Sequence, residues 1–402
     1  MLAPHHQRRI ELVAYLYCSN ASVRESKIAK DLGFARARVA EDLGIARKRG
    51  LVVQERRFIS ERMFDPIRLK ALRLLHQGVA LKKHLQRDSE RVRDVFVLDS
   101  GEEESLPNRL VRMGSSAAPV VYDLLRKAGC VGVAWGGTVG AVVEALQGYE
   151  GLGRIRTKPI EFVPICGEPL RARRRINSAT SLALELDQLV NGGMVNSRSL
   201  AGVPALIPRN FFEYGDIKLL KRFFQTATDY GAIFGGDVPG GVAIIDKMDM
   251  ILTSVGTATD HWKMCDVELR HEAEGITKAE LCRLAFGDIG GLLLPRPHLD
   301  AVEKENFEFL CEQWTGIRLA HYERVAKNCR EHAAPGVVVV AIAGNKADVL
   351  YQGVKAGLIN YIVCDHELAT ALAQLSKAPA IKELAKGFIA EGSSYVSDAL
   401  HG

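Results

Sequence analysis

From residue 94 onward, short apolar runs alternate with segments of helical periodicity, and this alternation restricts the possible folds most strongly. The strand-like runs are Asp94–Leu98, Cys130–Trp135, Glu161–Ile165, Met250–Val255, Gly336–Ala343 and Tyr361–Cys364. The helical segments are Arg109–Lys127, Gly137–Leu146, Ser178–Val190, Ala347–Ala356 and Leu368–Leu375. Strands that alternate with helices build a parallel sheet with helices on both faces. We therefore predict an α/β body with a doubly wound, mostly parallel sheet.

The chain is also divided by charge. Its 402 residues exceed what one ordinary core holds, so two or more domains are expected. The formal net charge is only +5. However, residues 1–93 carry 21 Lys and Arg against 10 Asp and Glu, whereas the remainder carries 32 against 38. A basic head on an acidic body predicts a polyanionic partner for the head alone.

Three short helices are predicted in the head, at residues 8–17, 25–32 and 36–49. Ala29 is small enough to let two helices cross closely. Gly33 follows four residues later and supplies a left-handed turn, and Val39 fills the angle between the helices. This spacing is typical of a helix-turn-helix.

The third predicted helix is strongly basic. Its cations, which are candidate DNA contacts, are Arg36, Arg38, Arg47, Lys48 and Arg49. Residues near its start are expected to face base edges, and later ones phosphates. Residues 51–59 are expected to form a wing, with Arg56 as a further candidate contact. The alternative is a solvated basic face on a three-helix core, but spacing and charge favour double-stranded operator DNA as the partner.

Residues 61–92 are predicted to connect a head at 1–60 to a body at 93–402. An apolar stripe with helical spacing runs along this segment and comprises Ile67, Ala71, Leu74, Leu75 and Val79. The stripe could form a dimer seam or pack on the body. A two-fold protein that reads a palindrome favours the seam.

Glycine-containing turns follow several predicted strands, at the edge where parallel sheets bind ligands. The candidate contacts in these turns are Gly136, Gly137, Thr138, Cys166, Gly167, Gly256, Asp288 and Lys346. Glycine lets backbone N–H groups approach an anion, a helix start adds partial positive charge, and a lysine can meet a phosphate. Each turn taken alone is also compatible with an ordinary strand-to-helix connection that binds nothing.

Several segments resemble the SorC family of sugar-responsive transcription regulators. Residues 132–139, GVAWGGTV, resemble the family's GVGWG-x-T turn, and residues 163–167, VPICG, are similar to its next strand end. Residues 287–291, GDIGG, resemble its GD-x-xG turn. Residues 339–370 look like its most distinctive segment, and residues 27–52 are similar to its helix-turn-helix and trailing AR-x-xGLV.

The resemblance implies a winged helix-turn-helix head and an effector body of the sugar-phosphate isomerase and deaminase type. It also implies a homodimer or homotetramer and a phosphorylated sugar or polyol as effector. The effector contacts that it implies are Gly136, Gly137, Thr138, Asp288 and Lys346. Cys166 stands where some members carry a basic residue that helps to grip phosphate, which a cysteine cannot do at neutral pH.

We predict an effector-controlled DNA-binding regulator and not an enzyme. An isomerase needs a carboxylate base over the sugar. Asp288 or Asp365 could serve, but no pair of acids shows a clear catalytic spacing. A third possibility is a regulator whose pocket has drifted, because residues 191–247 look expanded relative to the family.

Location and cofactors follow from simpler features. The eight cysteines include no C-x-x-C pair and are expected to be reduced thiols of a cytoplasmic protein. His261 and Cys265 have no second ligand pair beside them, so no metal is expected, and no cofactor is predicted. No apolar run approaches the roughly 18 residues that span a bilayer, so no membrane partner is predicted.

Overall fold

A computed structural model describes most of the chain. The described residues are 4–19, 24–49, 51–52, 66–101, 104–149, 158–168, 177–193, 198–215, 217–227, 229–235, 242–258, 276–331 and 334–377. The helices are α1 (Pro4–Ser19), α2 (Glu25–Leu32), α3 (Arg36–Lys48), α4 (Pro66–Asp88), α5 (Leu106–Leu125), α6 (Gly137–Gln147), α7 (Ala179–Asn191), α8 (Arg209–Tyr214), α9 (Ile217–Ala227), α10 (Tyr230–Phe234), α11 (Ile244–Lys247), α13 (Lys278–Leu284), α14 (Ala301–Glu312), α15 (Leu319–Glu331), α16 (Ala347–Lys355) and α17 (His366–Leu375), with a 3-10 turn, η3 (Gly344–Lys346). The strands are β1 (Asp94–Leu98), β2 (Cys130–Val133), β3 (Glu161–Pro164), β4 (Met250–Thr253), β5 (Val255–Thr257), β6 (Ala285–Ile289), β7 (Leu292–Pro295), β8 (Gly336–Ala341) and β9 (Tyr361–Asp365).

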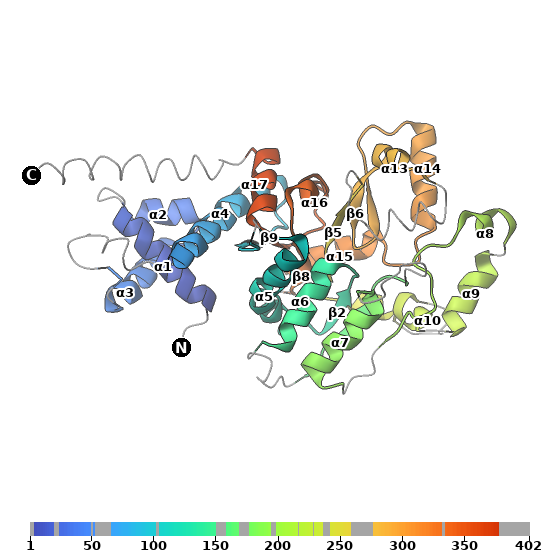
Figure 1. Cartoon of the computed structure of the whole chain (residues 1–402), viewed down its shortest axis with the longest axis horizontal. Coiled ribbons are helices and arrows are strands. Elements are labelled where there is room, and N and C mark those ends of the chain that lie inside the picture. Colours follow the sequence, from blue (N-terminus) through green and yellow to red (C-terminus); the bar gives the residue numbers. More distant parts are fainter. Residues whose placement is uncertain are drawn as a thin grey trace, which may run out of the picture.

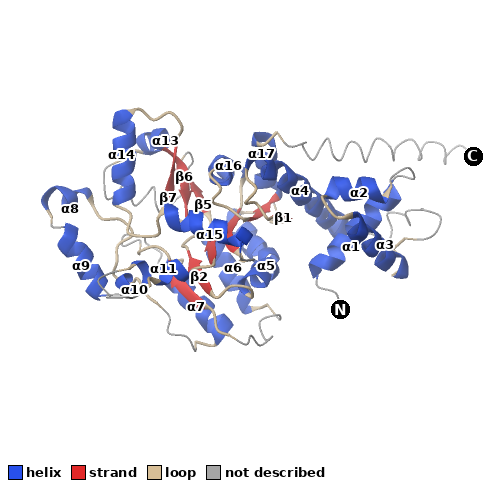
Figure 2. Ribbon diagram, turned by 180° about the vertical axis from the view of Figure 1, so that it is seen from behind, coloured by secondary structure: helices blue, strands red, loops and turns tan. Residues whose placement is uncertain are grey.

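The body is built on a six-stranded sheet in the order β1-β9-β8-β4-β2-β3. All of its strand pairs are parallel. Helices α5, α6 and α7 cover the face of the sheet that is turned to the viewer in Figure 1. Helix α15 covers the opposite face, which is turned to the viewer in Figure 2. The α/β class and the doubly wound parallel sheet are therefore confirmed. The carboxyl ends of all six strands meet at one edge, because parallel strands end on the same side.

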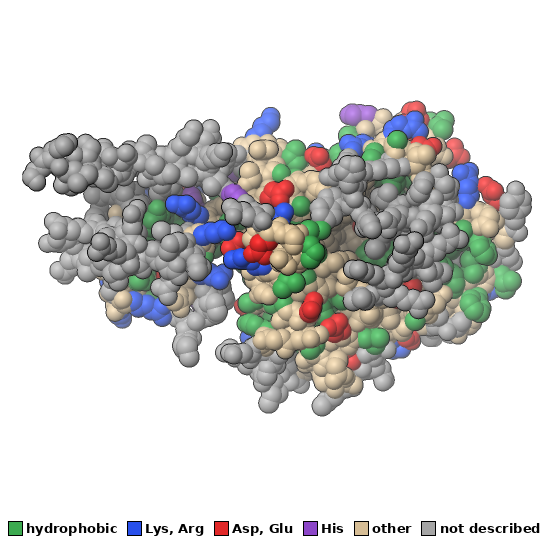
Figure 3. Space-filling model, in the orientation of Figure 1, with side chains coloured by type: hydrophobic (Ala, Val, Ile, Leu, Met, Phe, Trp, Pro, Cys, Tyr) green, Lys and Arg blue, Asp and Glu red, His purple; other side chains and the backbone are tan. Residues whose placement is uncertain are grey.

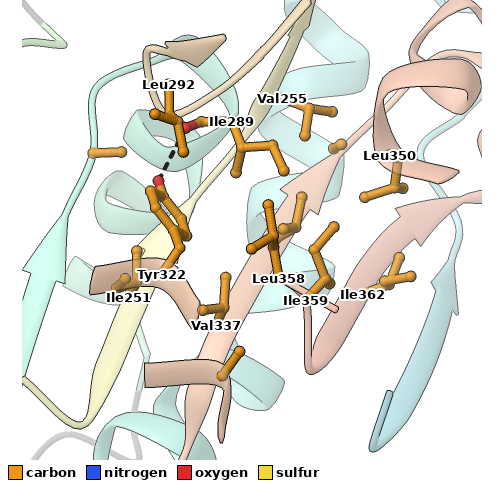
Figure 4. Close-up of a cluster of buried hydrophobic side chains, with 14 of the residues drawn as sticks. Ile251, Val255, Ile289, Leu292, Tyr322, Val337, Leu350, Leu358, Ile359 and Ile362 are labelled. Atoms are coloured by element: carbon orange, nitrogen blue, oxygen red, sulfur yellow. Dashed lines mark hydrogen bonds between the residues drawn. The ribbon is translucent and has the colours of Figure 1, made fainter. Parts of the chain in front are cut away.

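Alternation along the strands separates two cores. On β8, Val337 and Val339 face a cluster with α15, α16 and α17, whereas Val338 and Val340 face a cluster with α5, α6 and α7. Figure 4 shows the first cluster, in which the buried Tyr322 hydroxyl donates to the Ile289 carbonyl at 3.0 Å. Burial of each such aliphatic side chain stabilises the fold by about 1.5–3 kcal/mol. The sheet is therefore held from both faces.

A second, antiparallel sheet in the order β5-β6-β7 continues directly from the end of β4. This sheet corrects one expectation. Gly256 and the segment 287–291 were predicted as turns at the ends of parallel strands, but Gly256 lies within β5 and Asp288 within β6. Gly290 and Gly291, with φ of 58° and 94°, form the turn from β6 to β7. The apolar run 292–295 returns along β6 because this turn reverses the chain.

The head has the predicted helix-turn-helix geometry. Gly33 ends α2 in the left-handed conformation, with φ 69° and ψ 24°. The Phe34 N–H donates to the Ala29 carbonyl at 2.9 Å across this turn. Ala29 and Val39 are both buried in the head core, as the spacing predicted. The predicted wing after residue 52, including Arg56, lies outside the described residues.

Helix α4 joins the head to the body. Its Leu72 is buried in the head core, and Leu75 and Val79 pack against that core. Leu74 is buried in the body core instead. The apolar stripe predicted as a dimer seam is thus used within the chain for these three stripe residues. Packing on the body was the alternative, and it accounts for Leu74, whereas the packing of Leu75 and Val79 on the head was not predicted.

Candidate functional site

The helix α3 carries the candidate DNA contacts on its outer surface. Arg36, Arg38, Arg47, Lys48 and Arg49 are all exposed. Arg38 pairs with the neighbouring Glu41 at 2.9 Å, and the Arg47 guanidinium lies 5.6 Å from the Tyr17 ring centre. Figure 3 shows basic side chains on the visible surface of the head. This exposed basic helix follows the tight turn, which is the position of a recognition helix.

Sequence reasoning missed the contact that holds this helix in place. Asp42 is fully buried in α3 and accepts two hydrogen bonds from Arg9 of α1, at 2.7 and 3.0 Å. This bidentate contact raises the pKa of the Arg9 guanidinium. It fixes α3 against α1, because a buried carboxylate without a cation is strongly unfavourable. No local sequence pattern predicts a pairing between two residues that are 33 positions apart.

In the body, the glycine turn after β2 leads into the N-terminus of α6. Gly136 has φ 125°, and its N–H donates to the Asn177 carbonyl at 3.2 Å. Gly137 and Thr138 begin α6, and Thr138 is 4% exposed. The first N–H groups of a helix have no acceptor within it, so they favour an anion.

The β6–β7 turn packs against the chain just after β2 and β4. The Gly290 N–H donates to the Ser254 carbonyl at 3.1 Å. A Cβ at Gly290 would lie 2.5 Å from Thr253 Oγ1, 2.6 Å from the Tyr322 hydroxyl and 3.1 Å from the Ala134 side chain. The glycine turn of the second sheet therefore sits directly on the ends of β2 and β4.

Lys346 approaches from η3, at the end of β8. It is half-buried, and this burial lowers its pKa to about 8, against the opposing attraction of Asp288 and Asp365. Asp288 accepts from the Gly291 N–H at 2.7 Å, and Asp365 accepts from Arg109 at 2.7 Å. These short hydrogen bonds join the two acids to Gly291 and Arg109. Their effect on the Lys346 ammonium is electrostatic attraction.

Asp365 is a second buried acid whose partners the sequence did not predict. It is fully buried at the end of β9, and it accepts from Ser100 Oγ at 3.2 Å and from the Leu368 N–H at 3.0 Å. Arg109 of α5 bridges Asp365 and Glu367 at 2.7 Å each. Burial would raise the pKa of Glu367, but hydrogen bonds from Arg109 and the Gly344 N–H lower it overall. The sequence places Arg109 in a helix, but its partners are more than 250 residues away.

The backbone beside Lys346 is strained. Ala343 has φ 79°, a value that non-glycine residues rarely adopt, and its N–H points to the Asp365 carboxylate at 3.3 Å. Such a conformation costs about 1–3 kcal/mol and persists where surrounding contacts enforce it. The Asp365 carboxylate supplies one such contact.

The structure brings together most of the predicted effector contacts, but not all of them. The turn at 136–138, Asp288 and Lys346 lie around the carboxyl edge of the sheet, with Gly256 in the neighbouring β5. Cys166 is fully buried in an apolar cluster with Trp135 and Trp314. A Cβ at Gly167 would lie 2.7 Å from the carbonyls of residues 203 and 204. The space around Cys166 and Gly167 is therefore filled by other parts of the chain.

Among the described residues, no group of three or more His, Cys, Asp and Glu side chains could hold a metal ion. Within the same part of the chain, no helix has the length and apolar character to cross a bilayer. His261 and Cys265 lie outside the described residues.

Comparison with known proteins gives matches in structure alone. No protein-family profile matches the sequence, and no curated protein is similar to it. The full-length sorbitol operon regulator SorC from Klebsiella pneumoniae matches with a TM-score of 0.52 and 19% identity, over 91% of this chain and 98% of that one. Because this match covers 91% of the chain, it includes the head as well as the body.

Two further structures match over about three quarters of the chain. A transcriptional regulator from Streptococcus pneumoniae has a TM-score of 0.51 and 14% identity, over 74% of this chain and 97% of its own. A domain from Vibrio fischeri, named as a sugar-binding domain of a transcriptional repressor, has a TM-score of 0.50 and 17% identity, over 75% of this chain and 100% of its own. The resemblance to SorC-type regulators is thereby confirmed for the fold.

Proposed function

We propose that this chain is a transcription regulator whose DNA binding is controlled by a phosphorylated sugar or polyol. The observation that carries the proposal is the presence, in one chain, of an exposed basic helix after a tight turn and an anion-compatible edge on a parallel sheet. Proteins of the same fold include a sorbitol operon regulator and a domain named as sugar-binding. We further propose that the protein acts in the cytoplasm as a homodimer or homotetramer. The seven described cysteines are free thiols, which fits that compartment.

The effector would lie across the carboxyl edge of the sheet. Its phosphate would meet the N-terminus of α6 and the Lys346 ammonium, which together offer backbone donors and a charge. Its hydroxyls would face the polar groups nearby, among them Asp288. Lys346 and Arg109 face the acids Asp288, Asp365 and Glu367, so the cluster alone has no surplus of positive charge. The helix start is therefore essential to the anion site in this proposal.

An enzymatic role is less well supported. An isomerase needs a carboxylate that is poised to take a proton from the sugar. Asp365 is fully buried, pairs with Arg109 and caps α17, while Asp288 accepts from the Gly291 N–H. These contacts assign structural work to both acids, so we propose no catalysis.

A thermal-shift screen of phosphorylated sugars and polyols against the full chain tests the effector site. We expect at least one compound to raise the melting temperature, because a ligand that binds only the folded state stabilises it. The variant Thr138→Val/Lys346→Met should lose that shift while retaining its melting temperature without ligand to within a few degrees. A normal shift in this variant would show that the pocket lies elsewhere.

A further inference from the structure

The linker helix α4 is fixed to both halves of the molecule. Leu72 is buried in the head core, whereas Leu81 and Leu85 are buried in the body core. The helix has 23 residues and spans about 34 Å at 1.5 Å per residue. Figures 1 and 2 show it running from the head to the body, beside α17. A shift of α4 against the body would therefore move the head.

One buried polar contact fixes α4 against α17. Gln77 of α4 is 3% exposed. Its Oε1 lies 2.8 Å from His366 Nδ1, and its Nε2 donates to Thr370 Oγ1 at 3.4 Å. The Thr370 hydroxyl in turn donates to the His366 carbonyl at 2.8 Å. A buried amide that loses its hydrogen-bond partners is destabilising, so this contact favours one register of the two helices.

The same end of α17 is fixed by the candidate effector site. His366 directly follows Asp365, and Asp365 caps α17 by accepting from the Leu368 N–H. Asp365 also accepts from Arg109 and from the N–H of the strained Ala343, the residue directly before η3, which carries Lys346. Any change in the position of Asp365 therefore reaches His366 within one residue.

An exposed ion pair near the N-terminus of α4 also connects this helix to the part of the body around Arg109. Lys70 pairs with Asp99, just after β1, at 2.9 Å. Asp99 also lies 3.4 Å from Arg112, which is three residues along α5 from Arg109. Exposed ion pairs of this kind contribute little to stability because water and salt screen them. The buried Gln77 contact is thus the stronger of the two.

We propose that Gln77 transmits the occupancy of the strand-end anion site to the head, through His366 and the first turn of α17. An anion at this site competes with Asp365 and Glu367 for Arg109, and it repels the Asp365 carboxylate. The cap of α17 then adjusts, His366 moves with it, and α4 follows because Gln77 keeps its buried partners. This inference rests on the proposed function, and it assigns Gln77 and His366 as positioning residues that touch neither effector nor DNA.

Amide hydrogen exchange on the full chain, with and without inorganic phosphate at constant ionic strength, tests this path. In the unsubstituted protein, phosphate should change exchange rates in both the first turn of α17 and the middle of α4. A coupling of about 1–3 kcal/mol corresponds to roughly a fivefold or greater change. In Gln77→Met, the change in α17 should persist and the change in α4 should disappear.

Two further variants separate this path from a general loss of packing. Gln86→Met on the same helix removes a hydrogen bond to the Val92 carbonyl that has no link to α17, and it should respond like the unsubstituted protein. His366→Asn keeps an N–H donor close to the position of Nδ1 and should preserve the α4 response, whereas His366→Leu should abolish it.

The two possible failures are distinguishable. A phosphate response in α4 that survives in Gln77→Met would overturn this inference and leave the proposed function standing. An unsubstituted protein in which phosphate changes nothing in α17 would contradict the anion site itself, and the inference with it.

Discussion

At the scale of single residues, Lys346 carries the perturbed positive charge of the candidate effector site. Its pKa is lowered to about 8 by burial, although Asp288 and Asp365 oppose that shift. The unfolded chain, with a lysine pKa near 10.5, therefore binds more protons between about pH 8 and pH 10.5, and stability rises with pH across that window. Below about pH 8 the ammonium is charged and available to an anion.

The affinity for a sugar phosphate should consequently fall as the pH rises through about 8. The phosphate monoester stays a dianion over this range, because its second pKa is near 6. Loss of the charged partner should weaken binding by about 1.5–3 kcal/mol. Calorimetric titrations over this range measure the effect. Lys346→Met should bind weakly at every pH, whereas Lys304→Met on the exposed face of α14 should keep the full profile. A flat profile in the unsubstituted protein would remove Lys346 from the site.

The arginines at the start of α3 carry the DNA contact in the proposed function. Arg36→Ala/Arg38→Ala should weaken binding to an operator duplex by about 1 kcal/mol or more, because both side chains are exposed where a recognition helix meets DNA. Fluorescence anisotropy with labelled DNA measures this loss. The control is Arg283→Ala, which removes an exposed cation from the body. Equal affinities for the double variant and the control would contradict the assignment.

At the scale of elements, the turn between α2 and α3 depends on backbone conformation and not on space. A Cβ at Gly33 would meet no atom within 4 Å, and the same holds for Gly44 inside α3. Gly33, however, has φ 69°, where an L side chain is strained, whereas Gly44 has ordinary helical geometry.

The two glycines should therefore respond to alanine with opposite signs. Gly33→Ala should destabilise the head by about 1–2 kcal/mol. Gly44→Ala should stabilise it by about 0.5–1 kcal/mol, because alanine favours a helix interior and restricts the unfolded chain. Chemical denaturation followed by circular dichroism measures both values. If both variants lost stability alike, packing and not backbone conformation would control these positions.

The sequence predicted the elements of the parallel sheet well because each carries its own periodicity. The strand β8 is a continuous run of valines buried on both faces, and α2 was predicted with its observed bounds. Contacts between distant elements had no such local signal, as Arg109 with Asp365 and Arg9 with Asp42 illustrate. The hairpin of β6 and β7 was missed because a GDIGG segment fits a strand-to-helix turn as well as a β-turn.

At the scale of the whole molecule, the arrangement is a basic head, a shared helix and a sheet whose polar edge carries the candidate site. Leu75 and Val79 were expected at a dimer seam, and within this chain both are partly buried against the head core. The same helix is buried in the body through Leu74, Leu81 and Leu85. A single helix, α4, therefore packs against both the head with its candidate DNA contacts and the body with its candidate effector site. Such a physical connection is what linkage between the two sites requires.

Linkage of this kind is reciprocal: if a sugar phosphate changes the DNA affinity by some factor, DNA must change the sugar-phosphate affinity by the same factor. The most direct measurement is calorimetric titration of the sugar phosphate into the full chain, alone and saturated with operator duplex. We predict two dissociation constants that differ by about fivefold or more, with a ratio equal to the one measured for DNA by anisotropy. Identical constants with and without DNA would contradict the account.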